Sequence, residues 1–205
     1  MLALYHRGYS SIAPRYEGTW ESKGRFLTHP LHQDVTKVIH HCQTTPIKGA
    51  YHWEEADFRN EEFILLGANL GGTVMLQIAE DQDFKTIALS PVIFAESHYT
   101  KCEEKNMLFL KRFLRDGFGN AYRFSDTDRE KFARGDFFHL NHEKLKKKKK
   151  RILIITDKED IFIKQPPIDE FCESTGIQNL PVEDYGPLSI RKIDKKILQI
   201  IETFI

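Results

Sequence analysis

The segment from residue 63 to residue 79, FILLGANLGGTVMLQIA, constrains the fold more than any other part of the chain. It opens with an apolar run, passes through a glycine-rich turn around Asn69, and continues into a second apolar stretch. A short continuous apolar run bounded by glycine is typical of a strand buried on both faces. Small residues on either side of Asn69 let this strand and a following helix approach closely. The segment therefore predicts a buried strand, a tight turn and a helix over residues 72–80.

Similar apolar runs recur along the chain, and helical patterns lie between them. The other runs that we predict as strands are 2–5, 86–89, 151–156 and, more weakly, 179–182. Apolar residues spaced as on one helix face predict helices over 34–42, 106–115, 168–174 and 190–205. Strands that alternate with helices indicate an α/β fold, here a mostly parallel sheet of about five strands with flanking helices. Residues 8–30 and 117–150 lack such periodicity, so we expect one domain, 1–205, with a long loop at 8–30 and an irregular excursion at 117–150.

The composition of the chain disfavours some classes of binding partner. Its 205 residues carry 30 Lys and Arg against 30 Asp and Glu, which favours neither nucleic acid nor an anionic membrane as partner. No run of about 18 apolar residues is present, so no membrane span is predicted. Cys42, Cys102 and Cys172 are odd in number and far apart, which argues against a disulfide framework and favours a cytoplasmic location. Cys42 lies on an apolar helix face and is predicted to be buried and structural.

Residues 67–72 match the pattern G-x-N-x-G-G, in which Asn69 stands where G-x-S-x-G has serine. In the serine version the central residue sits on a strained strand-to-helix turn, and the next backbone N–H, here that of Leu70, helps to stabilise an oxyanion. Asparagine tolerates a positive φ, so Asn69 preserves the turn, but a carboxamide is not a competent nucleophile. The N–H groups of Leu70 and Gly71 remain candidates to bind a small anion or carboxylate, because they open a helix.

From these residues the chain resembles the α/β-hydrolase superfamily and, more loosely, its prolyl-oligopeptidase-like branch. LALYHRGYSS resembles the strand and R-G loop before the elbow, HQDVTKVIHH the helix leading into it, and LSPVIF the end of the next strand. RILIITDKEDIFI resembles the strand and loop that carry the catalytic acid, which places Asp160 at the acid position. EDYGPLSIRKIDKKILQII resembles the final G-H loop and terminal helix, which places Pro187 at the position of the catalytic histidine.

The resemblance implies a degenerate catalytic triad at Asn69, Asp160 and Pro187. With nucleophile and base both replaced, the Ser–His–acid mechanism cannot operate. We therefore expect a hydrolase-like protein that is inactive as a serine hydrolase and acts as a binding or interaction module. The alternative is a hydrolase of ester or peptide bonds that combines Asp160 with a histidine from elsewhere, such as His6 or His98, so the sequence alone leaves open whether the chain is an enzyme.

The resemblance also implies strands before LALY that this sequence does not contain. If the winding of that superfamily holds, every remaining crossover helix lies on one face of the sheet, and the C-terminal helix alone covers the other. Strands that are apolar on both sides then leave an apolar area, which a protein partner, a second copy of the chain or a rearranged N-terminal segment would cover. A third hypothesis is that the chain is a subunit or fragment completed by another chain.

Two histidine pairs stand at a spacing that metal sites use. They are His29-x-x-His32-x-Asp34 and His139-x-x-His142-Glu143. Short pairs of this kind arise often by chance among nine histidines, so we predict neither a metal site nor a cofactor. The run LKKKKKR at 145–151 is expected to be a solvated approach to a strand.

Overall fold

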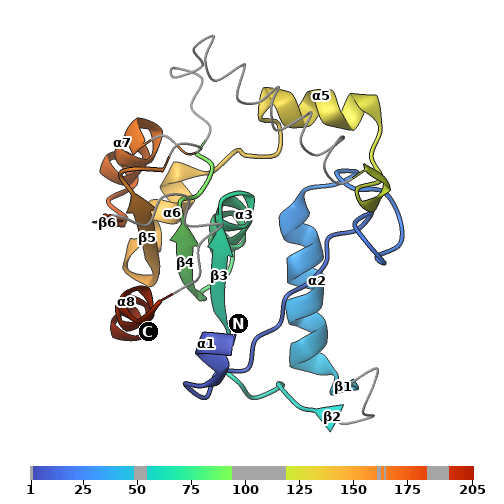
Figure 1. Ribbon diagram of the computed structural model, residues 1–205, viewed down its shortest axis with the longest axis horizontal. Helices are drawn as coiled ribbons and strands as arrows, with labels where there is room; N and C mark the ends of the chain where they lie inside the picture. Colours follow the sequence, from blue (N-terminus) through green and yellow to red (C-terminus); the bar gives the residue numbers. More distant parts are fainter. Residues whose placement is uncertain (1, 49–54, 94–118, 161–162, 164, 184–193) are drawn as a thin grey trace.

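Four parallel strands form the central sheet of this computed structural model, which describes residues 2–48, 55–93, 119–160, 163, 165–183 and 194–205. The strands are β3 (Ile64–Ala68), β4 (Lys85–Leu89), β5 (Ile152–Asp157) and β6 (Gln178–Val182), in that order across the sheet (Figure 1). The predicted parallel α/β sheet is confirmed. The strand predicted at 2–5 is wrong, because these residues form the short helix α1 (Leu2–Tyr5). Leucine and alanine are good helix formers, and no strand of the described part pairs with them.

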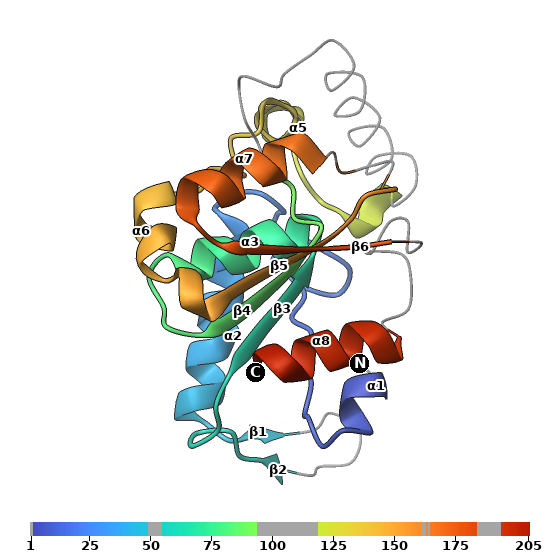
Figure 2. The same cartoon turned by 90° about the vertical axis from the view of Figure 1, so that its left-hand side faces the viewer.

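The helices divide between the two faces of the sheet. α3 (Leu70–Ala79), α6 (His142–Lys147) and α7 (Gln165–Thr175) lie on one side, and α8 (Lys195–Phe204) lies on the other (Figure 2). Successive residues of β4 point to opposite faces, as in any strand: Ala88 joins the cluster that contains α3 and α7, and Ile87 joins the cluster that contains α8. The expected division of the crossover helices and the C-terminal helix is confirmed for the described residues.

The helix that leads toward the central turn packs on α3, in a cluster that also contains Leu65 of β3. α2 (Leu31–Thr44) buries Leu31, Val35 and Ile39 in one cluster with Val74 and Met75 of α3. Its predicted counterpart, 34–42, is therefore confirmed with longer ends. After α2 a small antiparallel pair forms from β1 (Ile47–Lys48) and β2 (Glu55–Ala56).

The C-terminal helix begins later than the sequence predicts. α8 starts at Lys195, and the side chain of Asp194 caps it by accepting the N–H of Ile197 at 3.0 Å. The residues 190–193 of the predicted helix, and the whole predicted helix over 106–115, lie outside the described residues. The prediction for 168–174 is confirmed, because α7 spans that range and ends before Gly176, which has a φ of +69°.

The stretch 117–150 is less irregular than its composition suggests. It contains α5 (Asp126–Arg134), α6 and two short 3-10 turns, η2 (Gly119–Ala121) and η3 (Lys149–Arg151). α5 opens with a capping box, in which Ser125 and Asp128 each accept the other's backbone N–H, and ends at Gly135 in the left-handed conformation. The prediction of an irregular excursion is therefore wrong for this part. The S-x-x-D box and the closing glycine were the sequence signals.

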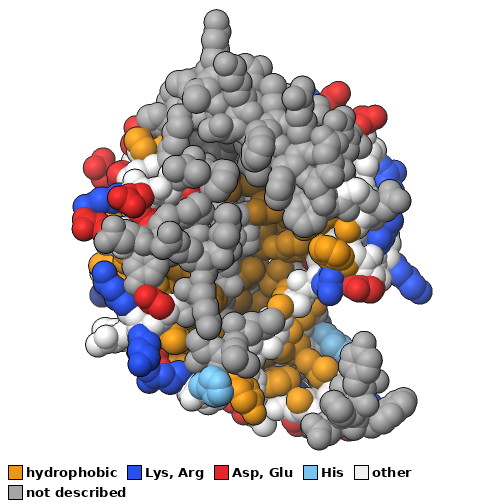
Figure 3. Space-filling view, viewed as in Figure 1, with side chains coloured by type: hydrophobic (Ala, Val, Ile, Leu, Met, Phe, Trp, Pro, Cys, Tyr) orange, Lys and Arg blue, Asp and Glu red, His pale blue; other side chains and the backbone are white. Residues whose placement is uncertain are grey.

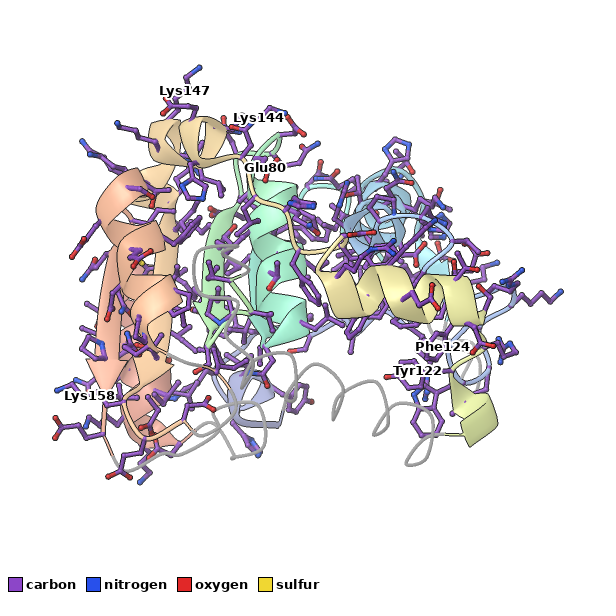
Figure 4. The ribbon with its side chains drawn as sticks, turned by 90° about the horizontal axis from the view of Figure 1, so that it is seen from above. Glu80, Tyr122, Phe124, Lys144, Lys147 and Lys158 are labelled. Carbon is purple, nitrogen blue, oxygen red and sulfur yellow. The ribbon has the colours of Figure 1, made fainter. Side chains whose placement is uncertain are left out.

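The loop at 8–30 is anchored by aromatic packing, and it contains no helix or strand, as predicted. Thr19 forms an isolated bridge with Tyr122, and Phe26 is 1% exposed. The ring centroid of Phe26 lies 5.0 Å from that of Tyr122 and 6.0 Å from that of Phe124. Figure 4 shows Tyr122 and Phe124 together on the segment that leads into α5.

The lysine run forms the outer surface of α6 and η3. Leu145 turns inward and is fully buried, whereas Lys147 points away from the molecule at the end where Glu80 and Lys144 lie (Figure 4). Lys144 pairs with Asp81 at 2.8 Å, and Lys148 pairs with Asp83 at 3.0 Å. This arrangement agrees with the predicted solvated run. None of the described helices is long and apolar enough to span a membrane.

Candidate functional site

The turn between β3 and α3 holds a conformation that few residues adopt. Asn69 has a φ of +47° and a ψ of −116°, between the last residue of β3 and the first of α3. Its N–H donates to the carbonyl of Leu89 at 2.9 Å, and its carbonyl accepts the N–H of Thr73 at 3.2 Å. These bonds tie the turn to the end of β4 and to the first turn of α3. The predicted tight turn is confirmed, and the helix starts at Leu70, two residues before the predicted start.

Two glycines make this turn sterically possible. A Cβ on Gly67 would lie 2.2 Å from the carbonyl oxygen of Gly71, and a Cβ on Gly72 would lie 3.1 Å from the Cβ of Pro91. The strand, the helix and the loop after β4 therefore approach one another as closely as backbone allows. Gly71 differs, because a Cβ there would meet no heavy atom within 4 Å. The space beside Gly71 is open.

The side chain of Asn69 is bound to the fold and is not presented as a reactive group. Its Nδ2 donates to the backbone carbonyl of Ser90 at 3.1 Å. Ser90 follows β4, is 1% exposed and has a φ of +40°. Its Oγ is buried and has no hydrogen-bond partner among the residues that the structure describes. Sequence reasoning missed Ser90; the Ser-Pro pair that ends an apolar run was the available signal.

The start of α3 presents backbone N–H groups with no counter-charge. No described side chain caps α3, and its first turn contains no acidic residue. The N–H groups of Leu70 and Gly71 donate to no acceptor in the described part of the chain. The hydroxyl of Thr73 holds the loop after β4 against this helix by donating to the carbonyl of Val92 at 2.7 Å. The helix macrodipole therefore leaves a partial positive charge here that an anion can compensate.

Asp160 lies on the loop after β5, at the same edge of the sheet as Asn69. Its Oδ1 accepts the N–H of Ile163 at 3.0 Å, and its own N–H donates to the carbonyl of Asp157 at 3.1 Å. β5 is two strands from β3, roughly 10 Å away, so a bridging side chain is needed to connect Asp160 with Asn69. Pro187, the predicted bridging position, lies outside the described residues.

The structure does not bring His6 to this edge. His6 follows α1, and α1 lies near the start of β3, toward the amino ends of the strands (Figures 1 and 2). Asn69 and Asp160 follow the carboxyl ends of β3 and β5. The other suggested histidine, His98, lies outside the described residues.

Comparison of the sequence with protein-family models and with curated proteins finds no match. Comparison of structures does find similar proteins. One is MGS-M2, an α/β-hydrolase enzyme from a Medee basin deep-sea metagenome library. Its sequence is 11% identical to this chain, and the two structures have a TM-score of 0.60. The match covers 89% of this chain and 74% of MGS-M2. A thermophilic esterase from Thermogutta terrifontis is 14% identical with a TM-score of 0.58 over 93% and 77% of the two chains. A carboxylesterase structure from the thaumarchaeon Nitrososphaera gargenis gives 14% identity and a TM-score of 0.57 over the same shares, 93% and 77%.

The chain has the α/β-hydrolase fold.

β3, Asn69 and α3 form a strand, a strained turn and a helix, the arrangement on which a G-x-S-x-G motif carries its central residue. Asn69 has a positive φ at this turn, and its carboxamide is bound to the carbonyl of Ser90. Figure 3 shows a hollow on one face of the molecule in which hydrophobic side chains gather, between β3 and α2 in the same view as Figure 1.

The remaining reactive side chains with predicted roles serve the packing of the fold. Cys42 is 1% exposed, and burial raises the pKa of its thiol, so the prediction of a structural cysteine is confirmed. His142 contacts the hydroxyl of Ser174 through Nδ1 at 2.9 Å and the ring edge of Phe171, and His139 is exposed. The pair at 139 and 142 therefore assembles no ligand set.

Proposed function

We propose that this α/β-hydrolase-fold protein is inactive as a serine hydrolase and binds a small carboxylate-bearing ligand at the start of α3. The observation that carries the proposal is Asn69. It keeps the elbow conformation at a φ of +47°, while its carboxamide donates to the carbonyl of Ser90. A site that keeps the shape of a hydrolase elbow without a nucleophile is suited to holding a group and not to attacking it.

The chemistry of the site favours a carboxylate over a cation or a neutral polar group. The N–H groups of Leu70 and Gly71 are donors at the positive end of a helix. The sequence places no charged residue within 67–73 or 90–93, so neither the turn nor the described part of the loop after β4 carries a charge that repels an anion. The open space beside Gly71 leaves room for the rest of the ligand.

The first test is for turnover. Purified, size-characterised protein should neither hydrolyse a short-chain p-nitrophenyl ester nor be labelled by a fluorophosphonate probe. Asp160→Ala is the matched variant, because Asp160 is the acid position that the resemblance retains. Turnover that disappears in Asp160→Ala would overturn the proposal and support a hydrolase with a non-standard constellation.

The second test is for binding. Short-chain carboxylates, followed by ligand-detected NMR, should bind the wild type and lose binding in Gly71→Leu, because the new side chain occupies the open space beside the helix amides. Gln82→Leu is the control, since Gln82 is exposed beyond the opposite end of α3. Equal binding in all three proteins, or no binding to the wild type, would remove the carboxylate from the proposal.

A further inference from the structure

We propose that Glu17, His29 and Asp34 form a binding site for a divalent zinc ion, where the N-terminal loop meets α2. Each residue offers one ligand atom, and these atoms all lie within 4.8 Å of one another. The site is separate from the elbow: it joins the loop at 8–30 to the first turns of α2. It does not depend on the function proposed for the start of α3.

The nitrogen and oxygen atoms already converge on one point. His29 Nε2 lies 2.7 Å from Asp34 Oδ1 and 3.9 Å from Glu17 Oε2. A tetrahedral zinc ion holds a nitrogen and an oxygen ligand about 3.3 Å apart, given bonds of about 2.0–2.1 Å to each. The His29–Asp34 pair therefore has to open by only about half an ångström, and the Glu17 carboxylate has to close by a similar amount.

Neighbouring groups hold the ligands in orientations that suit a metal. The Nδ1 of His29 contacts the hydroxyl of Thr28 at 3.2 Å, so Nε2 is the nitrogen that faces the two carboxylates. A partner on the second ring nitrogen is the usual arrangement of a ligating histidine. The Oδ2 of Asp34 accepts the backbone N–H of Glu17 at 2.9 Å, which leaves Oδ1 as the ligand atom. A hydrogen bond thus links two of the three ligand residues.

Gly24 leaves space for the carboxylate of Glu17, the third ligand. A Cβ on Gly24, which has a φ of +83°, would lie 2.1 Å from Glu17 Oε1. Glycine at 24 therefore leaves the space that the Glu17 carboxylate occupies. A larger residue would displace this carboxylate.

Burial and charge match a partly open metal site. The side chains of Asp34, His29 and Glu17 are 11%, 23% and 40% exposed, so the ligands are sheltered while water can reach the remaining coordination position. Two carboxylates converge on one imidazole, and Lys37 lies 3.8 Å from Asp34. A divalent cation would offset the repulsion between the carboxylates more completely than Lys37, which is 66% exposed. The imidazole nitrogen favours zinc over calcium or magnesium, which prefer oxygen ligands alone.

The sequence pattern contains His32 as the third candidate ligand, whereas the cluster in the structure contains Glu17. In His29-x-x-His32-x-Asp34, the structure joins His29 with Asp34, whereas His32 is outside the cluster. Glu17 takes the place of His32, and the distant position of Glu17 in the chain hides it from any spacing rule. The sequence-based prediction of no metal site considered the wrong ligand set.

The experiment titrates zinc into the chelator-treated full chain in competition with a chromophoric zinc chelator. The expected result is one zinc ion per chain, with affinity lowered about tenfold or more in Glu17→Gln and in His29→Gln. His41→Gln is the control, because His41 is an exposed histidine on the same helix and outside the cluster. Glu17→Gln is the decisive variant, since it removes a charge with almost no change of shape.

Cobalt(II) supplies a second readout. Its visible absorption intensifies in a low-coordinate site, and the wild-type spectrum should weaken in Glu17→Gln and persist in His41→Gln. The proposal is overturned if the wild type takes up no stoichiometric zinc, or if Glu17→Gln and His41→Gln bind it equally well. A hydrogen-bonded His29–Asp34 pair that only fastens the loop to α2 would give the first outcome, and zinc bound at other residues would give the second.

Discussion

Replacing Gly67 with alanine should destabilise the fold strongly, because the new Cβ has no space. It would lie 2.2 Å from the carbonyl oxygen and 2.5 Å from the carbonyl carbon of Gly71, and 2.7 Å from Met75 Cγ. Ordinary contacts begin near 3.4 Å, so α3 would have to move away from β3 by about an ångström. Overpacking typically costs about 1–3 kcal/mol, and the upper end applies here because the obstacle is backbone. For a chain of this length that corresponds to a melting temperature lowered by roughly 5–12 °C.

Gly71→Ala is the matched control, because Gly71 lies four residues further along the chain, in the first turn of α3. A Cβ there meets nothing within 4 Å, and the φ of Gly71 is not in the left-handed region. Alanine in a helix is favoured over glycine by about 0.4–1 kcal/mol, so this variant should be slightly more stable than the wild type. Urea unfolding followed by circular dichroism would measure both differences. If Gly67→Ala were as stable as the wild type, β3 and α3 would not pack as the elbow geometry requires, and the reasoning about Asn69 would fail with it.

Three further outcomes follow from individual side chains. Asn69→Ala should lower the free energy of unfolding by about 2 kcal/mol, from one hydrogen bond and a strained φ, whereas Asn69→Gly should cost only about 1 kcal/mol, which urea unfolding would distinguish. In a Cys102→Ser background, a thiol reagent should react only on unfolding, because burial raises the pKa of Cys42 and raises that of Cys172 to about 12; rapid reaction of the native protein would contradict this. Burial also raises the pKa of Glu80 above its ordinary value, so its contribution is present at low pH and is lost as pH rises through the folded-state pKa. Unfolding measured between about pH 4 and pH 7 should therefore show the wild type losing stability relative to Glu80→Gln, and parallel curves would refute the shift.

The parts of the fold that the sequence predicts well are those in which burial and periodicity agree. The apolar runs that became β4 and β5 are buried along almost their whole length, so their continuous pattern follows directly from their surroundings, whereas in β3 only Leu65 is buried. The run at 2–5 has the same composition, yet it forms a helix, because composition does not reveal whether a partner strand lies alongside. α5 went unnoticed for the opposite reason: its mean composition is polar, and its ends carry the signal.

The candidate site also has parts that the sequence predicts and parts that it does not. The turn at Asn69 is predictable because glycine spacing encodes a close approach of strand and helix, which is a local property. The bond from Asn69 to Ser90 joins residues 21 positions apart, and the link between Glu17 and Asp34 spans 17 positions. Such contacts depend on how β4 and the N-terminal loop are placed in space. No local pattern specifies that placement, which is why Ser90 and Glu17 emerge only from the structure.

The strained turn at Asn69 is held in place by bonds within the fold. A non-glycine residue at such a φ costs of order 1–3 kcal/mol. Asn69 offsets this with its N–H bonded to Leu89, its carbonyl bonded to Thr73 and its carboxamide bonded to Ser90, each of which contributes about 1 kcal/mol net. The strain is thus compensated within the fold, with no ligand and no reactive hydroxyl required. Serine at position 69 would not make the bond from the side chain to Ser90 in the same way. Its side chain is shorter, and in a catalytic triad its proton is donated to the base. Asparagine at position 69 thus stabilises the turn through a side-chain bond as well as two backbone bonds, which is compatible with the binding role proposed for this turn.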